Sequence, residues 1–340
     1  MSKKKIALIT SLKTKTLKMR FSCFLNVLYY AFLSLIFLLT NNKIKFYKFS
    51  KKLNEVVTYK TPKNYGHGAV SASMIRGLRD LNIPFTINDI IKDTETVILL
   101  ATTEDEIKEL AEIKKLGKIK KIVTTPACSL DTKFVFQLPA YECVDIALIA
   151  SEYVKNIYKK ELNNPSQEIM NKVVPWPSGV EVDEKICDKK FSKSCICYFK
   201  RTPINEKLVK MVEAKGIKVH CLEYYKYRFE DYMNILKKVD FVIFNQNYIE
   251  TQGLAMAEAW AKNRPTFINY DENEFGGITS PYLTSQTGLF YKNFEELSQI
   301  LDEYVEQQQT FLDKFSPQKW TIENMSDKST VQELLKILGI

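Results

Sequence analysis

The sequence predicts an α/β fold with two parallel-sheet domains, and three observations lead to this prediction. Short runs rich in β-branched and aromatic residues alternate with longer segments whose apolar residues recur at helical spacing. The alternation is interrupted at residues 173–179, where two prolines and a glycine fall within seven positions. The chain has 340 residues, which is enough for two domains.

The first series of elements indicates an N-terminal domain at residues 55–172. In its first expected helix Val70, Met74 and Leu78 recur at helical spacing. Ser151 is a favourable N-cap for its last helix. We expect strands at 55–59, 96–101, 121–125 and 145–150, and helices at 69–81, at 104–116 and from 151 onward.

The second series indicates a C-terminal domain at residues 173–315. We expect strands at 194–199, 218–222, 241–245 and 266–269, and helices at 206–214, 229–237 and 251–262. Alternating strands and helices favour parallel sheets, and ligands bind such sheets beyond the carboxyl ends of the strands. With two facing domains, this places the binding site in a cleft between them.

Residues 1–54 form a basic N-terminal segment that differs from the rest of the chain. They hold twelve Lys and Arg and no Asp or Glu, so the remainder carries 37 basic and 40 acidic residues. A folded part of this charge argues against nucleic acid as a partner. Residues 21–40 contain no charge and sixteen apolar residues, which predicts a membrane helix with flanking lysines at anionic lipid headgroups. The alternative is a helix that lies in the bilayer interface.

The sharpest local pattern is the segment from Glu250 to Glu258. A strand ends just before it and a helix is expected to begin near Thr251, so free backbone N–H groups there suit a phosphate or a sugar hydroxyl. Glu258 lies about two helical turns after Glu250, so both carboxylates can address one ligand. We therefore predict a donor-binding segment made of Thr251, Gln252, Gly253 and Leu254.

The E-x7-E spacing of Glu250 and Glu258, with Gly253 inside it, resembles the donor-site motif of the retaining GT-B glycosyltransferases of the group 1 type. The resemblance implies two Rossmann-like domains facing each other. It implies that Glu250 contacts the sugar hydroxyls and takes part in catalysis, and that Glu258 holds the nucleotide ribose. The implied activity is hexosyl transfer from a nucleotide-sugar donor to a glycan or lipid-linked acceptor, with retention.

Other segments resemble the same family in the same order. Gly66, His67 and Gly68 resemble its glycine-rich loop, which implies donor contacts from the glycines and an acceptor-side position for His67. Lys200 and Arg201 follow the first strand of the second series and resemble the basic residues that balance the diphosphate, with Lys207 as a third candidate. Residues 177–181 resemble the interdomain turn, and Trp320 with the helix near 331–338 implies that 316–340 packs back towards the N-terminal domain.

Two departures bear on mechanism. No D-x-D motif occurs, so we expect no metal and no cofactor, with the leaving-group charge balanced by Lys200, Arg201 and the helix start. Where many relatives have a histidine, residues 124–128 have none. The alternatives are therefore a catalytically degenerate nucleotide-sugar-binding protein, an epimerase on the same scaffold, and a membrane-anchored structural protein.

The seven cysteines are scattered, with neither metal-ligand nor disulfide spacing, which indicates a reducing compartment. Together with the cytosolic supply of nucleotide sugars, this predicts a membrane-associated protein whose catalytic part is cytoplasmic.

Overall fold

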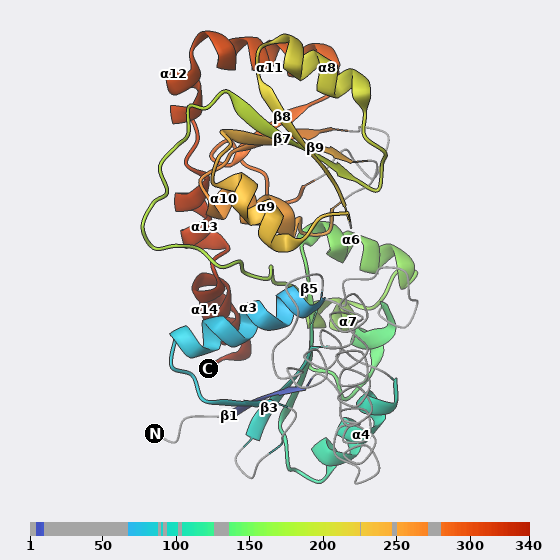
Figure 1. Ribbon diagram of the computed structural model, residues 1–340. Helices are drawn as coiled ribbons and strands as arrows, with labels where there is room; N and C mark the ends of the chain where they lie inside the picture. The colour runs from blue at the N-terminus through green and yellow to red at the C-terminus, as the bar shows by residue number, and fades with distance from the viewer. Residues whose placement is uncertain are drawn as a thin grey trace, which may run out of the picture. The chain divides into compact units, whose positions relative to one another are not determined.

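The computed structural model describes residues 5–9, 67–87, 90, 94–100, 104–125, 136–224, 226–246, 250–270 and 280–340. The chain divides into two compact units (Figure 1). The first unit takes its residues from 1–72 and 84–147, and the second from 73–83 and 148–340.

The first sheet has six strands, and the first five in its order are paired in parallel. Residues from β1 and β3 pack with Ile107 and Leu110 of helix α4 (Glu104–Lys115) in one apolar cluster. The strand order is β2 (Phe85–Ile87), β1 (Lys5–Ile9), β3 (Thr94–Leu99), β4 (Lys121–Thr124), β5 (Ile146–Ile149) and β6 (Val173–Pro175).

Strand β1 corrects the predicted start of the N-terminal domain. It lies between β2 and β3, and its residues 6–9 are fully buried. The prediction that residues 1–54 stand apart from the folded domains is therefore wrong at 5–9. The apolar run is only four residues long and follows three lysines, so the basic pattern obscured a strand that is buried on both faces. The strand expected at 55–59 lies outside the described residues.

The predicted membrane helix at 21–40 also lies outside the described residues. Among the helices of the described ranges, none has both the length and the apolar character needed to cross a bilayer. The anchor therefore stays a prediction.

The helices expected in the first series begin within two residues of their predicted starts. Helix α3 runs over His67–Asp80, two residues earlier than expected, and α4 begins at Glu104 as expected. Helix α6 (Glu152–Glu161) has Ser151 as its N-cap, whose Oγ accepts from the N–H of Val154 at 3.4 Å. A further short helix, α7 (Gln167–Lys172), was not predicted.

The Pro-rich stretch at 173–179 is more than a linker. Its first three residues form β6, and Trp176 is fully buried. The N–H of Trp176 donates to the carbonyl of Ile149, and its indole N–H donates to the carbonyl of Thr330, both at 2.8 Å. These bonds join the stretch to the end of β5 and to residue 330 within the second unit.

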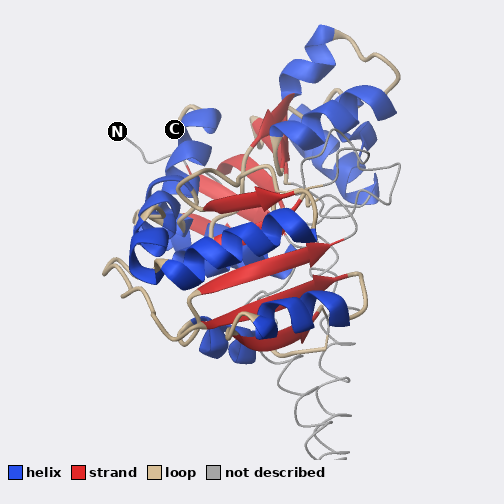
Figure 2. Cartoon of the chain, turned by 90° about the horizontal axis from the view of Figure 1, so that it is seen from above, coloured by secondary structure: helices blue, strands red, loops and turns tan. Residues whose placement is uncertain are grey.

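The second sheet has five strands, all paired in parallel. Alternate residues of its strands point to opposite faces, and each face has its own core. Ile196 and Tyr198 pack with helices α9 (Phe229–Leu236) and α10 (Leu254–Ala261), whereas Cys197 and Phe199 pack with α8 (Glu206–Ala214) and α11 (Phe294–Glu306). Figures 1 and 2 show helices over the parallel strands. The order is β11 (Gly288–Tyr291), β10 (Thr266–Asn269), β9 (Phe241–Gln246), β7 (Ser194–Lys200) and β8 (Lys218–Glu223).

Three helices complete the second unit, namely α12 (Gln308–Asp313), α13 (Pro317–Asn324) and α14 (Asp327–Leu338). Trp320 of α13 packs edge-on against Trp260 of α10, with ring centroids 5.6 Å apart. The sequence predicts that Trp320 packs towards the N-terminal domain, but its aromatic partner belongs to the second unit.

Helix α14 also contacts α3. The Nε of Arg76 donates to Asp327 at 2.5 Å, and its Nη2 donates to the other carboxylate oxygen at 3.3 Å. The two helices are so close that a Cβ on Gly77 would lie 2.2 Å from the carbonyl oxygen of Asp327. The sequence places α3 in the N-terminal domain, whereas its residues 73–80 group with the second unit.

Candidate functional site

The strand order of the second sheet identifies where a ligand binds. If the five strands are numbered along the chain, they lie side by side in the order second, first, third, fourth and fifth. The direction of winding therefore reverses between β7 and β9. Ligands of open parallel sheets bind beyond the carboxyl ends of the strands at this switch point. Lys200 is the last residue of β7 and pairs in register with Gln246, the last residue of β9.

A buried ion pair lies at this switch point. The Nζ of Lys200 donates to Oε1 of Glu250, which follows β9 by four residues. The side chains are 14% and 7% exposed, respectively, so both charges are largely withdrawn from water. The same ammonium lies 5.0 Å from the ring centroid of Tyr224, directly after β8. The structure thus brings together Lys200 and Glu250, two of the three residues predicted to be catalytic.

The helix after Glu250 begins later than predicted. Helix α10 starts at Leu254, and Gly253 is its N-cap with φ 82° and ψ 56°, a left-handed conformation that favours glycine. The amides of Met256 and Ala257 donate to the carbonyl of Gly253 at 3.0 and 3.1 Å. Glu250 therefore lies in the loop before the helix, and the expected separation of about two helical turns between Glu250 and Glu258 does not hold. Amides 251–253 precede the helix, near the positive end of its dipole.

The side chain of Gln252 is buried and bonds to the backbone of Ser178. Its side chain is 5% exposed, and it donates to the carbonyl of Ser178 at 2.5 Å and accepts from the N–H of Ser178 at 3.0 Å. These bonds fix the loop to residues 177–179. Thr251 is half-buried, and the half-buried Leu254 packs against the core that contains α10.

Glu258 is half-buried on α10, and its environment makes it a weak acid. Burial raises its pKa to about 8, although the charges of Lys200 and Arg76 act in the opposite direction. Three tyrosines, Tyr198, Tyr227 and Tyr232, interact electrostatically with Glu258. The hydroxyls of Tyr198 and Tyr227 share a hydrogen bond of 2.7 Å. Burial raises the pKa of each phenol, and the Glu258 carboxyl adds to this effect. The carboxyl group therefore sits between basic and phenolic groups near the switch point.

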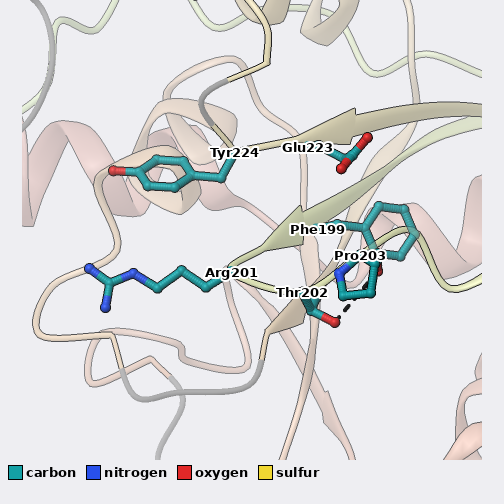
Figure 3. A pocket seen from close by; sticks show the side chains of 6 residues that line it. All are labelled: Phe199, Arg201, Thr202, Pro203, Glu223 and Tyr224. Atoms are coloured by element: carbon teal, nitrogen blue, oxygen red, sulfur yellow. Dashed lines mark hydrogen bonds between the residues drawn. The ribbon is translucent and has the colours of Figure 1, made fainter.

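An open pocket of about 340 Å³ lies at the carboxyl ends of β7 and β8 (Figure 3). Arg201 and Tyr224 extend their side chains to the same side of it, from neighbouring strand ends. Arg201 is exposed and has φ 55°, which turns the chain sharply after β7. The lining residues are Phe199, Arg201, Thr202, Pro203, Glu223 and Tyr224.

The remaining predicted residues lie elsewhere. Lys207 is exposed on α8 and is not among the residues that line the pocket. Gly66 is outside the described residues, and His67 begins α3 without a described side chain. Gly68 lies in the first turn of that helix rather than in a loop.

Tyr224 is the site residue that the sequence analysis missed. It is the residue directly after β8, and Lys200 is the last residue of the neighbouring strand β7. The N–H of Tyr224 donates to the carbonyl of Phe199 at 2.9 Å. The rule that ligands meet the carboxyl ends of strands could have identified it. Across the described part of the chain, no three or more His, Cys, Asp or Glu side chains gather in a way that could hold a metal ion.

Comparison with known proteins shows similarity in structure alone. No protein-family model matches the sequence, and no curated protein matches it either. HepE of Anabaena, solved in complex with UDP and glucose, is 10% identical, with 98% of this chain and 99% of that chain covered and a TM-score of 0.52. A glycosyltransferase from Rickettsia africae is 13% identical, with coverage of 99% and 98% and a TM-score of 0.52. The chain therefore has the two-domain α/β fold of these proteins.

Proposed function

We propose that this chain is a glycosyltransferase that binds a nucleotide-sugar donor at the carboxyl ends of β7 and β9. The observation that carries the proposal is the buried pair of Lys200 and Glu250 beside the start of α10. At this switch point of a parallel sheet, Lys200 provides a cation that can bind a phosphate, and Glu250 provides a carboxylate that can bind sugar hydroxyls. The backbone amides before α10 can bind an anion.

The fold supports the proposal independently of the site. HepE, which has a similar fold, was solved with UDP-glucose and with UDP and glucose. The ligand of HepE supports UDP-glucose as one of the donors to test with this chain.

In the proposed reaction the bond between the anomeric carbon and the β-phosphate oxygen breaks, and a bond to an acceptor hydroxyl oxygen forms. The nucleoside diphosphate leaves with the bonding electron pair, and its leaving oxygen takes the proton that the acceptor hydroxyl gives up. Lys200, Arg201 and the amides at 251–253 balance the charge that develops on the leaving group. Glu250 orients the sugar through its hydroxyls, and Glu258 accepts from the ribose hydroxyls.

Retention at the anomeric carbon and independence from metal are part of the proposal. Both follow from the resemblance of Glu250 and Glu258 to the E-x7-E motif and from the lack of a D-x-D motif in the sequence. The proposed acceptor is a glycan or a lipid-linked glycan, with residues 21–40 and their flanking lysines holding the protein at a membrane and the catalytic part in the cytoplasm.

A second candidate is a protein that binds the donor without transferring it. It is favoured by the sequence from the end of β4 onward, because Thr124, Thr125 and the next three residues include no histidine. A donor that binds without release of free sugar or transfer product over hours would favour this candidate.

The experiment is calorimetric binding of UDP-, GDP- and ADP-glucose to the purified full chain. The full chain is required because β1 comes from residues 5–9. We expect micromolar binding of one donor by the wild type and its loss in Glu258→Ala. Glu303→Ala is the matched control, since this exposed residue of α11 lies outside the proposed site. Absence of binding across the panel, or wild-type affinity in Glu258→Ala, would contradict the proposed site.

A further inference from the structure

Arg76 of helix α3 is held by a buried carboxylate of the second unit. Its Nε donates to Oδ2 of Asp327 at 2.5 Å, and its Nη2 donates to Oδ1 at 3.3 Å. The Asp327 side chain is 6% exposed and the Arg76 side chain 33%. Both residues belong to the same compact unit as Glu258. Because both carboxylate oxygens bind one planar guanidinium, the positive charge of Arg76 has a fixed place beside α14.

The backbone before Asp327 joins this ion pair to the core that contains α10. The N–H of Asp327 donates to the carbonyl of Val180 at 3.1 Å, and the N–H of Val180 donates to the carbonyl of Met325 at 2.9 Å. Val180 and Met325 pack in one apolar cluster with the residues of α10 on either side of Glu258. The guanidinium of Arg76 is thereby anchored next to the core against which α10 packs.

Two cations act on the Glu258 carboxyl. Burial favours its neutral form and raises its pKa to about 8, whereas the charges of Lys200 and Arg76 favour the ionised form. The charged and titratable groups around Glu258 are Lys200, Arg76, Tyr198, Tyr227 and Tyr232, and the adjoining helix α13 adds the exposed Lys319 and Glu323.

The proposed role of Glu258 depends on its charge. An ionised carboxylate accepts through both oxygens, as binding of two ribose hydroxyls requires, whereas a neutral carboxyl carries a proton on one of them. Lys200 is assigned to the diphosphate of the donor. Arg76 is held by Asp327, so its charge stays beside α10 whichever partner Lys200 binds.

We propose that Arg76 is a positioning residue of the donor site, whose charge holds Glu258 in the ionised form that accepts from the ribose hydroxyls. The inference rests on the proposed function and adds a residue that no sequence motif identified. Arg76 acts through Glu258 and is assigned no contact with the donor. Asp327 supports it by keeping the guanidinium in place.

The first measurement follows the titration of Glu258 without any nucleotide. Urea denaturation gives the difference in free energy of unfolding between the wild type and Glu258→Gln at each pH. Because burial raises the folded-state pKa, this difference falls as pH rises and levels off at that pKa. We expect this levelling pH to be about 8 for the wild type. It should be higher by about half a pH unit or more when both proteins also carry Arg76→Met.

Arg79→Met and Asp327→Asn are the matched controls. Arg79 is the next cation of α3 and is exposed, so its loss removes the same charge from the same helix. It should move the levelling pH by less than about 0.2 unit, because water screens an exposed charge. Asp327→Asn breaks the ion pair but keeps the charge of Arg76, so the levelling pH should stay the same or decrease. Equal upward shifts with Arg76→Met and Asp327→Asn would indicate loosened packing and overturn the proposal.

Two further variants keep the test decisive if Arg76→Met does not fold, since it leaves the Asp327 carboxylate buried without its cation. Arg76→Met combined with Asp327→Asn removes both charges and should still raise the levelling pH. Arg76→Lys keeps the charge and should show less than half of that increase. No increase with the combined variant, or an equal increase with Arg76→Lys, would contradict the proposal.

The second measurement is calorimetric binding of UDP-, GDP- and ADP-glucose at pH 7 and pH 9. With a pKa of about 8, a rise of half a unit lowers the ionised fraction of Glu258 about threefold at pH 7 and less than about 1.5-fold at pH 9. We expect Arg76→Met to weaken donor binding by these factors, relative to the wild type at the same pH. Equal weakening at both pH values would indicate a purely structural role and overturn the proposal.

The two measurements distinguish this inference from the proposed function. If the wild type binds none of the three donors, the proposed function fails, and the role of Arg76 in a donor site fails with it. If a donor binds but Arg76→Met leaves the levelling pH unchanged, the role of Arg76 alone is refuted.

Discussion

Gln252 and Ser178 form a closed pair of hydrogen bonds between a buried side chain and a backbone 74 residues away. The Gln252 amide donates to the carbonyl of Ser178 at 2.5 Å, and its oxygen accepts from the Ser178 N–H at 3.0 Å. This pair fixes the loop that contains Glu250 to the stretch that follows β6. It explains why a residue within the donor motif need not touch the donor.

Replacement of Gln252 by Ala is expected to lower the free energy of unfolding by about 2–3 kcal/mol, because the backbone groups of Ser178 lose their partners in a buried site. Urea denaturation measures this effect. Gln309→Ala, at an exposed position of α12, is the control and should change stability by less than about 0.5 kcal/mol. Equal effects of both substitutions would show that the Ser178 bonds contribute little.

Gly253→Ala is expected to destabilise the protein more than Gly216→Ala. Both glycines have left-handed φ values, 82° and 74°, so each substitution carries a conformational cost of about 1–2 kcal/mol. A Cβ at 253 would also lie 3.0 Å from the sulfur of Met256, whereas a Cβ at 216 meets nothing within 4 Å. Thermal or urea unfolding of the two variants measures the difference. A smaller loss for Gly253→Ala would contradict the close contact at the start of α10.

The pKa of Glu258 predicts how stability depends on pH. Because burial raises the folded-state pKa from 4.5 to about 8, the folded protein binds more protons than the unfolded chain between these values. Stability contributed by neutral Glu258 is therefore fully present below pH 4.5, falls as pH rises, and is lost above pH 8. The slope from this one group is at most about 1.4 kcal/mol per pH unit.

Urea denaturation of the wild type and of Glu258→Gln across pH 5–9 tests this dependence. The difference between the two proteins should vary with pH, with the wild type losing stability relative to the variant towards pH 8. Parallel curves would mean that Glu258 titrates normally in the folded protein.

Most helices and strands of the second unit could be predicted from the sequence, because they depend on local patterns of residues. Helix α8 and strand β10 have the predicted bounds, because a β-branched or aromatic run and an amphipathic period are local properties of the chain. The ion pair between Lys200 and Glu250 could not be predicted in the same way. It depends on β7 and β9 being neighbours, which is a property of sheet order.

Two predictions were wrong because they depended on non-local structure: the missing strand β1 and the start of helix α10. Strand β1 is recognisable only by its central place in the sheet, since a four-residue apolar run after three lysines carries little local signal. Helix α10 starts at Leu254 rather than Thr251 because Gly253 adopts a left-handed conformation and Gln252 is bound to Ser178. Neither the conformation nor the partner is visible in the spacing of the glutamates.

Lys200 and Arg201 are expected to contribute unequally to nucleotide binding. Lys200 is buried beside Glu250, so Lys200→Met should weaken nucleoside diphosphate binding at least tenfold. Arg201 is exposed in the open pocket, where water screens its charge, so Arg201→Ala should weaken binding about two- to fivefold, with a reduced dependence on salt. Calorimetry at two salt concentrations distinguishes them. A larger effect at Arg201 would place the diphosphate in the pocket rather than at the switch point.

A crystal structure of the full chain with the nucleotide that binds would locate the nucleotide-sugar site that we propose at the carboxyl ends of β7 and β9. We expect the diphosphate between the Lys200 ammonium and the amides of residues 251–253, with the ribose hydroxyls at Glu258. A nucleotide bound away from these strand ends would refute the proposed site.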